Sequence, residues 1–358
     1  MNWLRRKLGY ASAPAGIDLV LTDDCNLKCA YCARGGSSRT APVPAYMEVA
    51  RALDLVDELA ELRPRPFIRL FGGEPFLHPE WDRIVRHASD RGVWCTAVTN
   101  GTLLGEHARR LTDSGLLAVG ISLDGHAGIH DPVRGRGTFD RIMAGLEALE
   151  DCRKGSGSPH PLVEIYATVQ PSNVGRLVEF ARFLAGKPIA LLRLQHLIWC
   201  TPEQFERTRR LVAPLFPGQA VLEEEAPYQR AGPPDVDPVV FLRQKRELER
   251  TRWPFKVEFH PNLPDRQWTP FLTQSSCGPR DSEHCRNMEA YAYIRPTGAL
   301  RPCVSVEIGN VFERPFRELW NAAGFRAFRR LVRSHGRLPA CARCPDWGIA
   351  PPAAVFHI

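Results

Sequence analysis

The first 215 residues alternate short apolar runs with amphipathic segments, and this alternation constrains the fold more than any other feature of the sequence. Between the runs, apolar positions recur every three or four residues, as at Leu53, Val56 and Leu59, which predicts helices. Strands that alternate with helices form a parallel α/β sheet with right-handed crossovers. Six such units predict a partial (β/α)6 barrel, because the full closed form needs eight. The six predicted strands are residues 16–22, 67–71, 93–99, 117–123, 162–169 and 190–197.

The pattern changes after this region. Residues 216–276 are rich in proline, and we expect them to form a connecting region that covers the mouth of the barrel. Residues 277–358 hold five cysteines, a hairpin-like run with its turn at Pro296–Gly298, and one helix or two within 315–332. We therefore expect three parts: a barrel over residues 1–215, the connecting region, and a small C-terminal domain.

A cysteine cluster, CNLKCAYC, follows the first predicted strand. Cys25, Cys29 and Cys32 have C-x3-C-x2-C spacing, and three such thiolates can hold three irons of a four-iron, four-sulfur cluster. The cysteine motifs of ferredoxins supply a fourth cysteine ligand, whereas the next cysteine in this sequence after Cys32 is Cys95. An open metal position is where a small molecule can bind and react, which is what separates catalytic from structural metal sites. A zinc knuckle, or three unrelated buried cysteines, is the alternative interpretation.

Distinctive polar and glycine residues follow the next three strands. In a barrel of this kind, reactive groups lie at the C-terminal ends of the strands. Glycines allow a backbone to approach a ligand closely, and a carboxylate accepts charge-assisted hydrogen bonds from an ammonium group. The residues are Gly72, Gly73 and Glu74 after the second strand, Asn100 after the third, Ser122 and Asp124 after the fourth, and Arg134 in the loop beyond.

The cysteine run, with Tyr31 before its third cysteine, and these motifs in this order resemble the signature of the radical S-adenosylmethionine (SAM) enzymes. The resemblance covers about residues 16–200. It implies that Glu74 holds the SAM amino group and that Arg134, with its planar guanidinium, holds the SAM carboxylate. The fifth strand ends in ATVQPSN, without the glycine-rich adenine motif of some members, so adenine contacts are expected near Val169 and Asn173. The other expected SAM contacts are Gly72, Gly73, Asn100, Ser122 and Asp124.

A second cysteine set lies in the C-terminal part. Cys285 and Cys303 flank the predicted hairpin, and Cys341 and Cys344 form a CxxC pair after the predicted helix. The pattern resembles the twitch domain, the shorter relative of the SPASM domain, which carries one auxiliary four-iron cluster. A structural zinc site with four cysteine ligands is the alternative that this spacing allows. The resemblance thus implies two [4Fe–4S] clusters and SAM as cofactors.

Four cysteines remain outside the two sets. We expect Cys95 to lie in the core. Cys152 follows a predicted helix, and we expect it to have no special function. Cys200, just past the sixth strand, and Cys277 are candidates for a catalytic thiol that faces the active site, with Cys277 preferred. His196 is a weaker candidate for a substrate contact.

The resemblance implies that SAM is cleaved to a 5′-deoxyadenosyl radical, which removes a hydrogen atom from a substrate C–H bond. The substrate is then oxidised, with the auxiliary cluster as electron acceptor, or epimerised, with a thiol as hydrogen donor. The spacing of Cys285 and Cys303 and the terminal CxxC resemble those of an aminocyclitol dehydrogenase, which favours a small sugar- or aminocyclitol-like substrate in natural-product biosynthesis. Only about 15 residues precede the first strand, so we expect no leader-binding domain there. Modification of a ribosomal peptide is the alternative, and a non-catalytic zinc-binding module is a remote one.

Composition limits the partners. The 47 Lys and Arg exceed the 40 Asp and Glu by seven, but no block of five like charges occurs, so a nucleic-acid partner is not expected. Seven of the eleven cysteines fall into metal-type clusters, which favours a reducing cytoplasm. No signal peptide and no run of 18 apolar residues are recognisable, so no membrane partner is expected. Reductive cleavage of SAM, which the resemblance implies, needs a one-electron reductant such as flavodoxin or ferredoxin.

Overall fold

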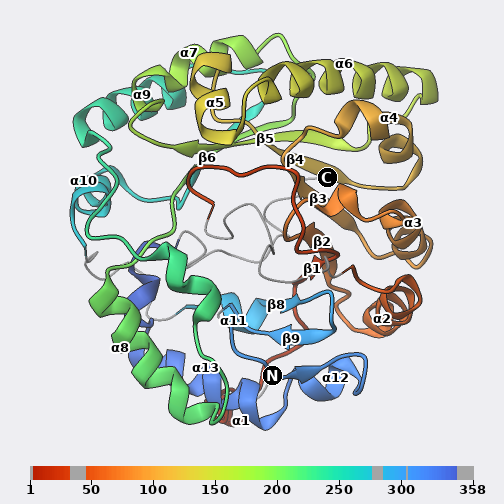
Figure 1. Ribbon diagram of the computed structural model, residues 1–358, viewed down its shortest axis with the longest axis vertical. Coiled ribbons are helices and arrows are strands. Elements are labelled where there is room, and N and C mark those ends of the chain that lie inside the picture. The colour runs from red at the N-terminus through yellow and green to blue at the C-terminus, as the bar shows by residue number, and fades with distance from the viewer. Residues whose placement is uncertain (1–2, 33–45, 276–284, 304, 345–358) are drawn as a thin grey trace.

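The computed structural model describes residues 3–32, 46–275, 285–303 and 305–344. Their strands form one ten-stranded sheet in the order β10-β9-β8-β1-β2-β3-β4-β5-β6-β7. The sheet curves around the centre of the molecule, and helices α2, α3, α4, α6, α7 and α9 lie on its outer side (Figure 1).

All six predicted strands are present, parallel to one another and in sequence order. Residues on their outer faces, such as Ile17, Leu70 and Ile165, are fully buried against the helices, and this burial stabilises the sheet. The partial (β/α)6 barrel is confirmed, with its sheet open at β10 and β7 among the described residues. The strands are β1 (Gly16–Val20), β2 (Phe67–Phe71), β3 (Cys95–Thr99), β4 (Ala118–Ser122), β5 (Leu162–Val169) and β6 (Leu191–His196).

The predicted helices of the barrel also form. Each turns its apolar positions toward the sheet, as Leu55, Val56 and Leu59 do in α2, because a helix of period 3.6 places them on one face. Helix α5 (Ala127–Arg134) was not predicted, since Pro132 interrupts its pattern. The helices are α2 (Val49–Glu61), α3 (Trp81–Asp90), α4 (Leu104–Asp113), α6 (Thr138–Ser156), α7 (Leu177–Leu184) and α8 (Pro202–Val212).

The proline-rich connecting region contains a strand that the sequence pattern did not reveal. Between α9 (Pro238–Arg250) and α10 (Asp265–Thr273), the segment β7 (Lys256–His260) pairs in parallel with β6. The unpaired edge of β6 offers backbone donors and acceptors to any extended neighbour, and a five-residue segment suffices to use them. The barrel sheet therefore has a seventh parallel strand.

The C-terminal part extends the sheet at its other edge. The predicted hairpin is formed by β8 (Tyr291–Ile294) and β9 (Ala299–Arg301), and β8 also pairs in parallel with β1. Gly298 has a φ of +85° in the turn, and a Cβ there would lie 2.3 Å from Asn310 Oδ1, so the turn requires glycine. The remaining elements are α1 (Trp3–Lys7), α11 (Asn287–Ala290), β10 (Gly309–Asn310), α12 (Phe316–Leu319) and α13 (Ala323–His335).

Side chains join the C-terminal part to the barrel. Glu58 on α2 accepts hydrogen bonds from the backbone N–H groups of Phe316 and Arg317, at 2.8 and 3.0 Å. Because the sheet runs through both parts, the division at residues 215 and 276 stays a prediction. Along the described chain, no helix combines the length and apolar character that crossing a bilayer requires.

Candidate active site

A cavity of about 1600 Å³ lies on the inner side of the curved sheet, lined by residues of strands β1 to β9 and of the loops at their ends. A pocket for one drug-sized ligand usually measures roughly 300–1,000 Å³. The cavity therefore has room for a nucleotide-sized cofactor and a substrate together.

The three cysteines of CNLKCAYC all line this cavity. Asn100, at the end of β3, fixes their loop: its Nδ2 donates to Asn26 Oδ1 at 2.7 Å and to Cys25 Sγ at 3.8 Å. Burial raises the pKa of the Cys25 thiol to about 11 and also raises that of Cys29. Since thiolates are the metal-binding form, a bound metal must supply the positive charge that displaces these protons. Three thiol groups at one cavity wall fit the three protein ligands of a cluster with one open iron.

The two glycines before Glu74 bring two loops into contact. The N–H groups of Gly73 and Glu74 donate to the carbonyls of Thr22 and Asp24, at 3.1 and 2.7 Å. A Cβ on Gly73 would lie only 1.9 Å from the Asp24 oxygen. Gly72 and Gly73 line the cavity as predicted for ligand contacts, but their close approach is to the backbone that leads into the cysteine run.

Glu74 lies deeper than its predicted role suggests. Its carboxylate is fully buried and accepts hydrogen bonds from Asn100 N (2.7 Å), Thr99 Oγ1 (2.8 Å) and Phe76 N (3.2 Å). It is not among the described residues that line the cavity. The carboxylate thus holds the end of β3 in place, and its contact with the SAM amino group stays a prediction.

The buried position of Glu74 has a measurable pH consequence. Burial raises its pKa to about 7 from an ordinary 4.5, against the smaller opposing effect of its hydrogen bonds. The folded protein therefore keeps a proton that the unfolded chain releases, and the resulting stabilisation is present below about pH 4.5 and lost as the pH rises through about 7. Between pH 5 and 8 we expect wild type to lose roughly 2.5 kcal/mol of unfolding free energy that Glu74→Gln does not lose.

Chemical denaturation of both proteins across this pH range measures the difference. Glu61→Gln, at an exposed position on the end of α2, is the matched control and should follow wild type. Parallel pH profiles for wild type and Glu74→Gln would contradict the expectation.

Asp124 organises the opposite side of the cysteine run. Its Oδ2 accepts hydrogen bonds from Arg134 Nε (2.6 Å) and from Tyr31 Oη (2.7 Å), and its Oδ1 accepts one from Thr168 N (2.8 Å). Burial alone would raise the pKa of Asp124, but the Arg134 charge and these hydrogen bonds hold it below its usual range. Asp124 is buried behind Arg134, which does line the cavity. The Arg134 guanidinium is therefore oriented by Asp124 before any ligand arrives.

The other predicted SAM contacts fall into two groups. Asn100 and Ser122 line the cavity. Val169 and Asn173 are buried and are not among its described lining residues, and Asn173 instead donates to the carbonyls of Asp124 and Thr168. The SAM roles of all four stay predictions.

The second cysteine set reaches the same cavity. Cys303, Cys341 and Cys344 line it, while Cys285 is buried in an apolar cluster that Cys303 and Cys341 border. Among the described residues, no three His, Cys, Asp or Glu side chains have the arrangement that a single metal ion needs. An iron–sulfur cluster binds each cysteine through a different iron atom, and four cysteines match its donor set in number and type.

The remaining candidates differ in their surroundings. Cys200 is buried and lines the cavity, and Cys277 lies outside the described residues. His196 also lines it, packed against Phe241 and Trp268, and burial lowers its pKa to about 3, so it is a neutral imidazole. Cys95 lies in the core, as predicted.

Sequence reasoning missed the polar inner face of the barrel. Polar residues at alternate positions of β5, β6 and β7 form this face, including Glu164, Tyr166, Arg193 and Glu258, all of which line the cavity. Period-two alternation within an apolar run carried this signal, because alternate residues of a strand point to opposite faces.

Comparisons with known proteins agree with this site. The family model of the radical SAM superfamily matches residues 19–163, and that of SPASM, an iron–sulfur cluster-binding domain, matches residues 285–345. An AdoMet-dependent heme synthase of Nitratidesulfovibrio vulgaris is 34% identical over 327 residues, which cover 90% of this chain and 83% of the relative. The mycofactocin maturase MftC of Mycolicibacterium smegmatis is 33% identical over 187 residues, which cover 52% of this chain and 45% of the relative.

A solved structure shares the fold. SuiB of Streptococcus suis, bound to S-adenosylmethionine, superposes with a TM-score of 0.65 at 14% identity, covering 91% of this chain and 69% of that one. The chain belongs to the radical SAM superfamily. Its C-terminal part is an iron–sulfur cluster-binding domain of the SPASM type, and its cofactors are [4Fe–4S] clusters and SAM, as predicted.

Proposed function

We propose that this radical SAM enzyme oxidises a small sugar- or aminocyclitol-like substrate by removing two hydrogens. The observation that carries the proposal is that the whole first cysteine set and three of the four cysteines of the second set line one cavity. A substrate held there lies between the site of radical generation and a second cluster. Short separation from an electron acceptor favours oxidation of a substrate radical over its reduction.

When bound, SAM would supply a 5′-deoxyadenosyl radical for hydrogen-atom abstraction, and an auxiliary cluster would supply an acceptor for the electron left on the substrate. In our proposal Cys25, Cys29 and Cys32 hold the first cluster. The second is held by Cys285, Cys303, Cys341 and Cys344. Arg134, oriented by Asp124, binds the SAM carboxylate, and the buried Glu74 positions Asn100 beside the cysteine run.

Epimerisation is a second candidate, and Cys200 supports it. This thiol lines the cavity at the end of the β6 loop, where it could return a hydrogen atom to a substrate radical. The backbone of Cys200 is fixed by hydrogen bonds with Tyr228 O (3.1 Å) and Arg230 N (2.9 Å). A hydrogen donor must be held opposite the deoxyadenosyl group, and a fixed backbone is suited to that task.

The chain is similar to a heme synthase over most of its length, and this similarity suggests a larger substrate, a tetrapyrrole, as an alternative. Carboxylate groups of such a substrate would need cations at the cavity wall. Three arginines there already pair with carboxylates: Arg69 with Asp18 (2.6 Å), Arg193 with Glu258 (3.1 Å) and Arg295 with Asp23 (2.8 Å). This pairing supports the smaller, less acidic substrate. A ribosomal peptide also stays an alternative.

Anaerobic incubation with SAM and dithionite tests the class through formation of 5′-deoxyadenosine, and no such product would exclude it. Mass spectrometry of converted sugars and aminocyclitols tests the outcome. A product two hydrogens lighter is expected, whereas a product of equal mass that carries solvent deuterium would favour epimerisation. In the cell, the proposed reductant, a flavodoxin or ferredoxin, would take the place of dithionite. We propose a cytoplasmic location, where such electron carriers are present.

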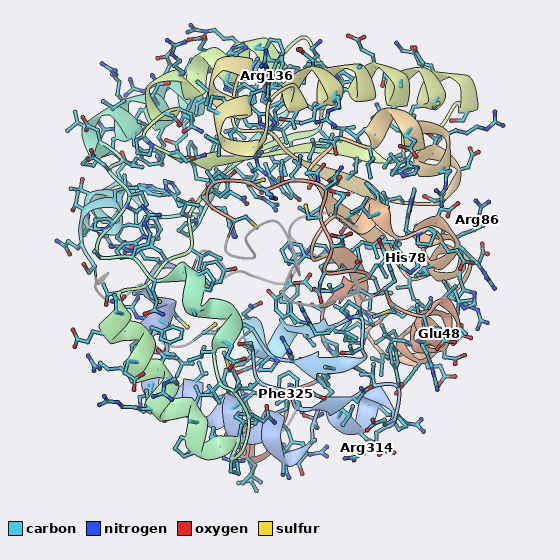
Figure 2. The ribbon with its side chains drawn as sticks, in the orientation of Figure 1. Glu48, His78, Arg86, Arg136, Arg314 and Phe325 are labelled. Carbon is cyan, nitrogen blue, oxygen red and sulfur yellow. The ribbon has the colours of Figure 1, made fainter. Side chains whose placement is uncertain are left out.

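Arg134→Lys provides a test of the SAM contact. Lysine keeps the charge but cannot make the planar, forked contact of a guanidinium. Loss of one charge-assisted hydrogen bond, about 1.5–3 kcal/mol, should weaken SAM binding roughly 10- to 150-fold in equilibrium titrations. Arg136→Lys is the matched control, since Arg136 is exposed on the outside of the molecule (Figure 2). Equal SAM affinity in Arg134→Lys and wild type would remove this role.

A further inference from the structure

Two polar side chains on the inner face of β5 have no part in the proposed cofactor sites. Glu164 and Tyr166 alternate with the buried Val163 and Ile165, so they project from the sheet into the cavity, which both line. The Tyr166 hydroxyl donates a 2.5 Å hydrogen bond to Glu164 Oε2. The two side chains thus act as one unit at the cavity wall.

The neighbouring strands hold this unit in one orientation. On β4, a Cβ at Gly120 would lie 2.4 Å from the Tyr166 ring, so the ring rests against a bare stretch of backbone. On β6, the Arg193 guanidinium lies 4.7 Å from the centre of the same ring. A tyrosine fixed on both sides presents its hydroxyl, and the Glu164 carboxylate beyond it, in a defined direction.

Charge pairing separates Glu164 from the other carboxylates of the cavity wall. Glu258 pairs with Arg193 at 3.1 Å, and Glu249 pairs with Lys245 at 2.6 Å. For Glu164, no cation among the described residues lies within 4.0 Å, although the Arg193 charge acts on it from a longer distance, and Tyr166 is its hydrogen-bond partner. A partly buried carboxylate with unused acceptor positions is stabilised by any donor that enters the cavity, most of all by a charged one.

We propose that Glu164, oriented by Tyr166, is a specificity-determining residue that binds an ammonium or hydroxyl group of the substrate. It selects amino-substituted polyols over neutral and acidic molecules of the same size. The inference rests on the proposed small-molecule function, but it concerns how the substrate is bound and not what the reaction produces. Formation of deoxyadenosine and the mass of the product test that function separately.

Binding of three six-membered-ring probes to the anaerobically reconstituted enzyme with SAM tests the inference by calorimetry. The probes are 2-deoxystreptamine, which carries ammonium groups, neutral myo-inositol and anionic glucuronate. We expect wild type to prefer 2-deoxystreptamine by at least about tenfold, and Glu164→Gln to lose 10- to 150-fold of that affinity. Glu249→Gln is the matched control, because Glu249 lines the same cavity but is paired with Lys245, and it should keep the preference.

Tyr166→Phe should lower the same preference by a smaller factor, since it frees the carboxylate without removing it. Thermal unfolding of each variant shows whether the fold is kept. Equal affinity of wild type for the three probes, failure of the amine to bind, or an unchanged preference in a folded Glu164→Gln would overturn the inference.

Discussion

Replacing Cys25, Cys29 and Cys32 together by alanine should abolish reductive cleavage of SAM and leave the C-terminal cluster in place. These three thiols line the cavity beside Asn100 and Arg134, and no other described cysteine belongs to their loop. Because the C-terminal set lies on separate elements, it should still assemble its cluster. Roughly half of the iron and sulfide of the reconstituted wild type should therefore remain.

Iron and sulfide determination, with chromatography for 5′-deoxyadenosine, measures both expectations. Cys152→Ala is the matched control, since Cys152 is half-buried on α6, away from both sets, and it should keep full iron content and activity. Continued production of 5′-deoxyadenosine by the triple variant would show that the cluster assignment is wrong. Loss of all iron would show that the two sets do not assemble independently.

Replacing Cys341 and Cys344 together by alanine should have the second large effect, on the fate of the substrate radical. Both thiols line the cavity, on the short helical turn Pro339–Arg343 and at its end. If they hold the electron acceptor, their loss should stop formation of the product two hydrogens lighter while 5′-deoxyadenosine still forms. The expected yield of that product falls below detection.

Cys200→Ala separates this outcome from epimerisation. In a dehydrogenase it should be nearly silent, whereas in an epimerase it should stop solvent deuterium from entering the product. The Cys277 thiol, which lies outside the described residues, is tested in the same way by Cys277→Ala. The single variant Cys303→Ser repeats the cluster test with a smaller change. A lighter product formed normally by the Cys341, Cys344 double variant would overturn the acceptor role of this set.

The sequence motifs mark the residue types that we expect to contact SAM, but they do not show how these residues are arranged. Glu74, Asp124 and Arg134 were recognised from short motifs at strand ends, and they do surround the cysteine run. Their contacts were not predictable, because the sequence does not show that Asp124 pairs with Arg134 or that Glu74 turns its carboxylate onto Asn100. Hydrogen-bond partners of buried carboxylates depend on loops that only the folded sheet brings together.

The inner face of the barrel shows a similar limit. Alternation in β5 marks Glu164 and Tyr166 as residues of one face, but it does not say whether that face is core, solvent or cavity. Only the folded sheet shows that this face lines a cavity, together with Gly120, Arg193 and Glu258 of other strands.

By itself, the sequence determined the six strands, most of the helices between them and the two cysteine sets, because these depend on local periodicity and spacing. Its motifs also indicated the resemblance to the radical SAM enzymes. Tertiary structure alone decided that β7 extends the sheet beyond β6, that β8 lies beside β1, and that cysteines of both sets line one cavity. The physical reason is that these features join segments that are far apart in the sequence, from about 60 residues for β6 and β7 to more than 200 for β1 and β8. They follow from unpaired sheet edges and from the curvature of the whole sheet, which no local pattern records.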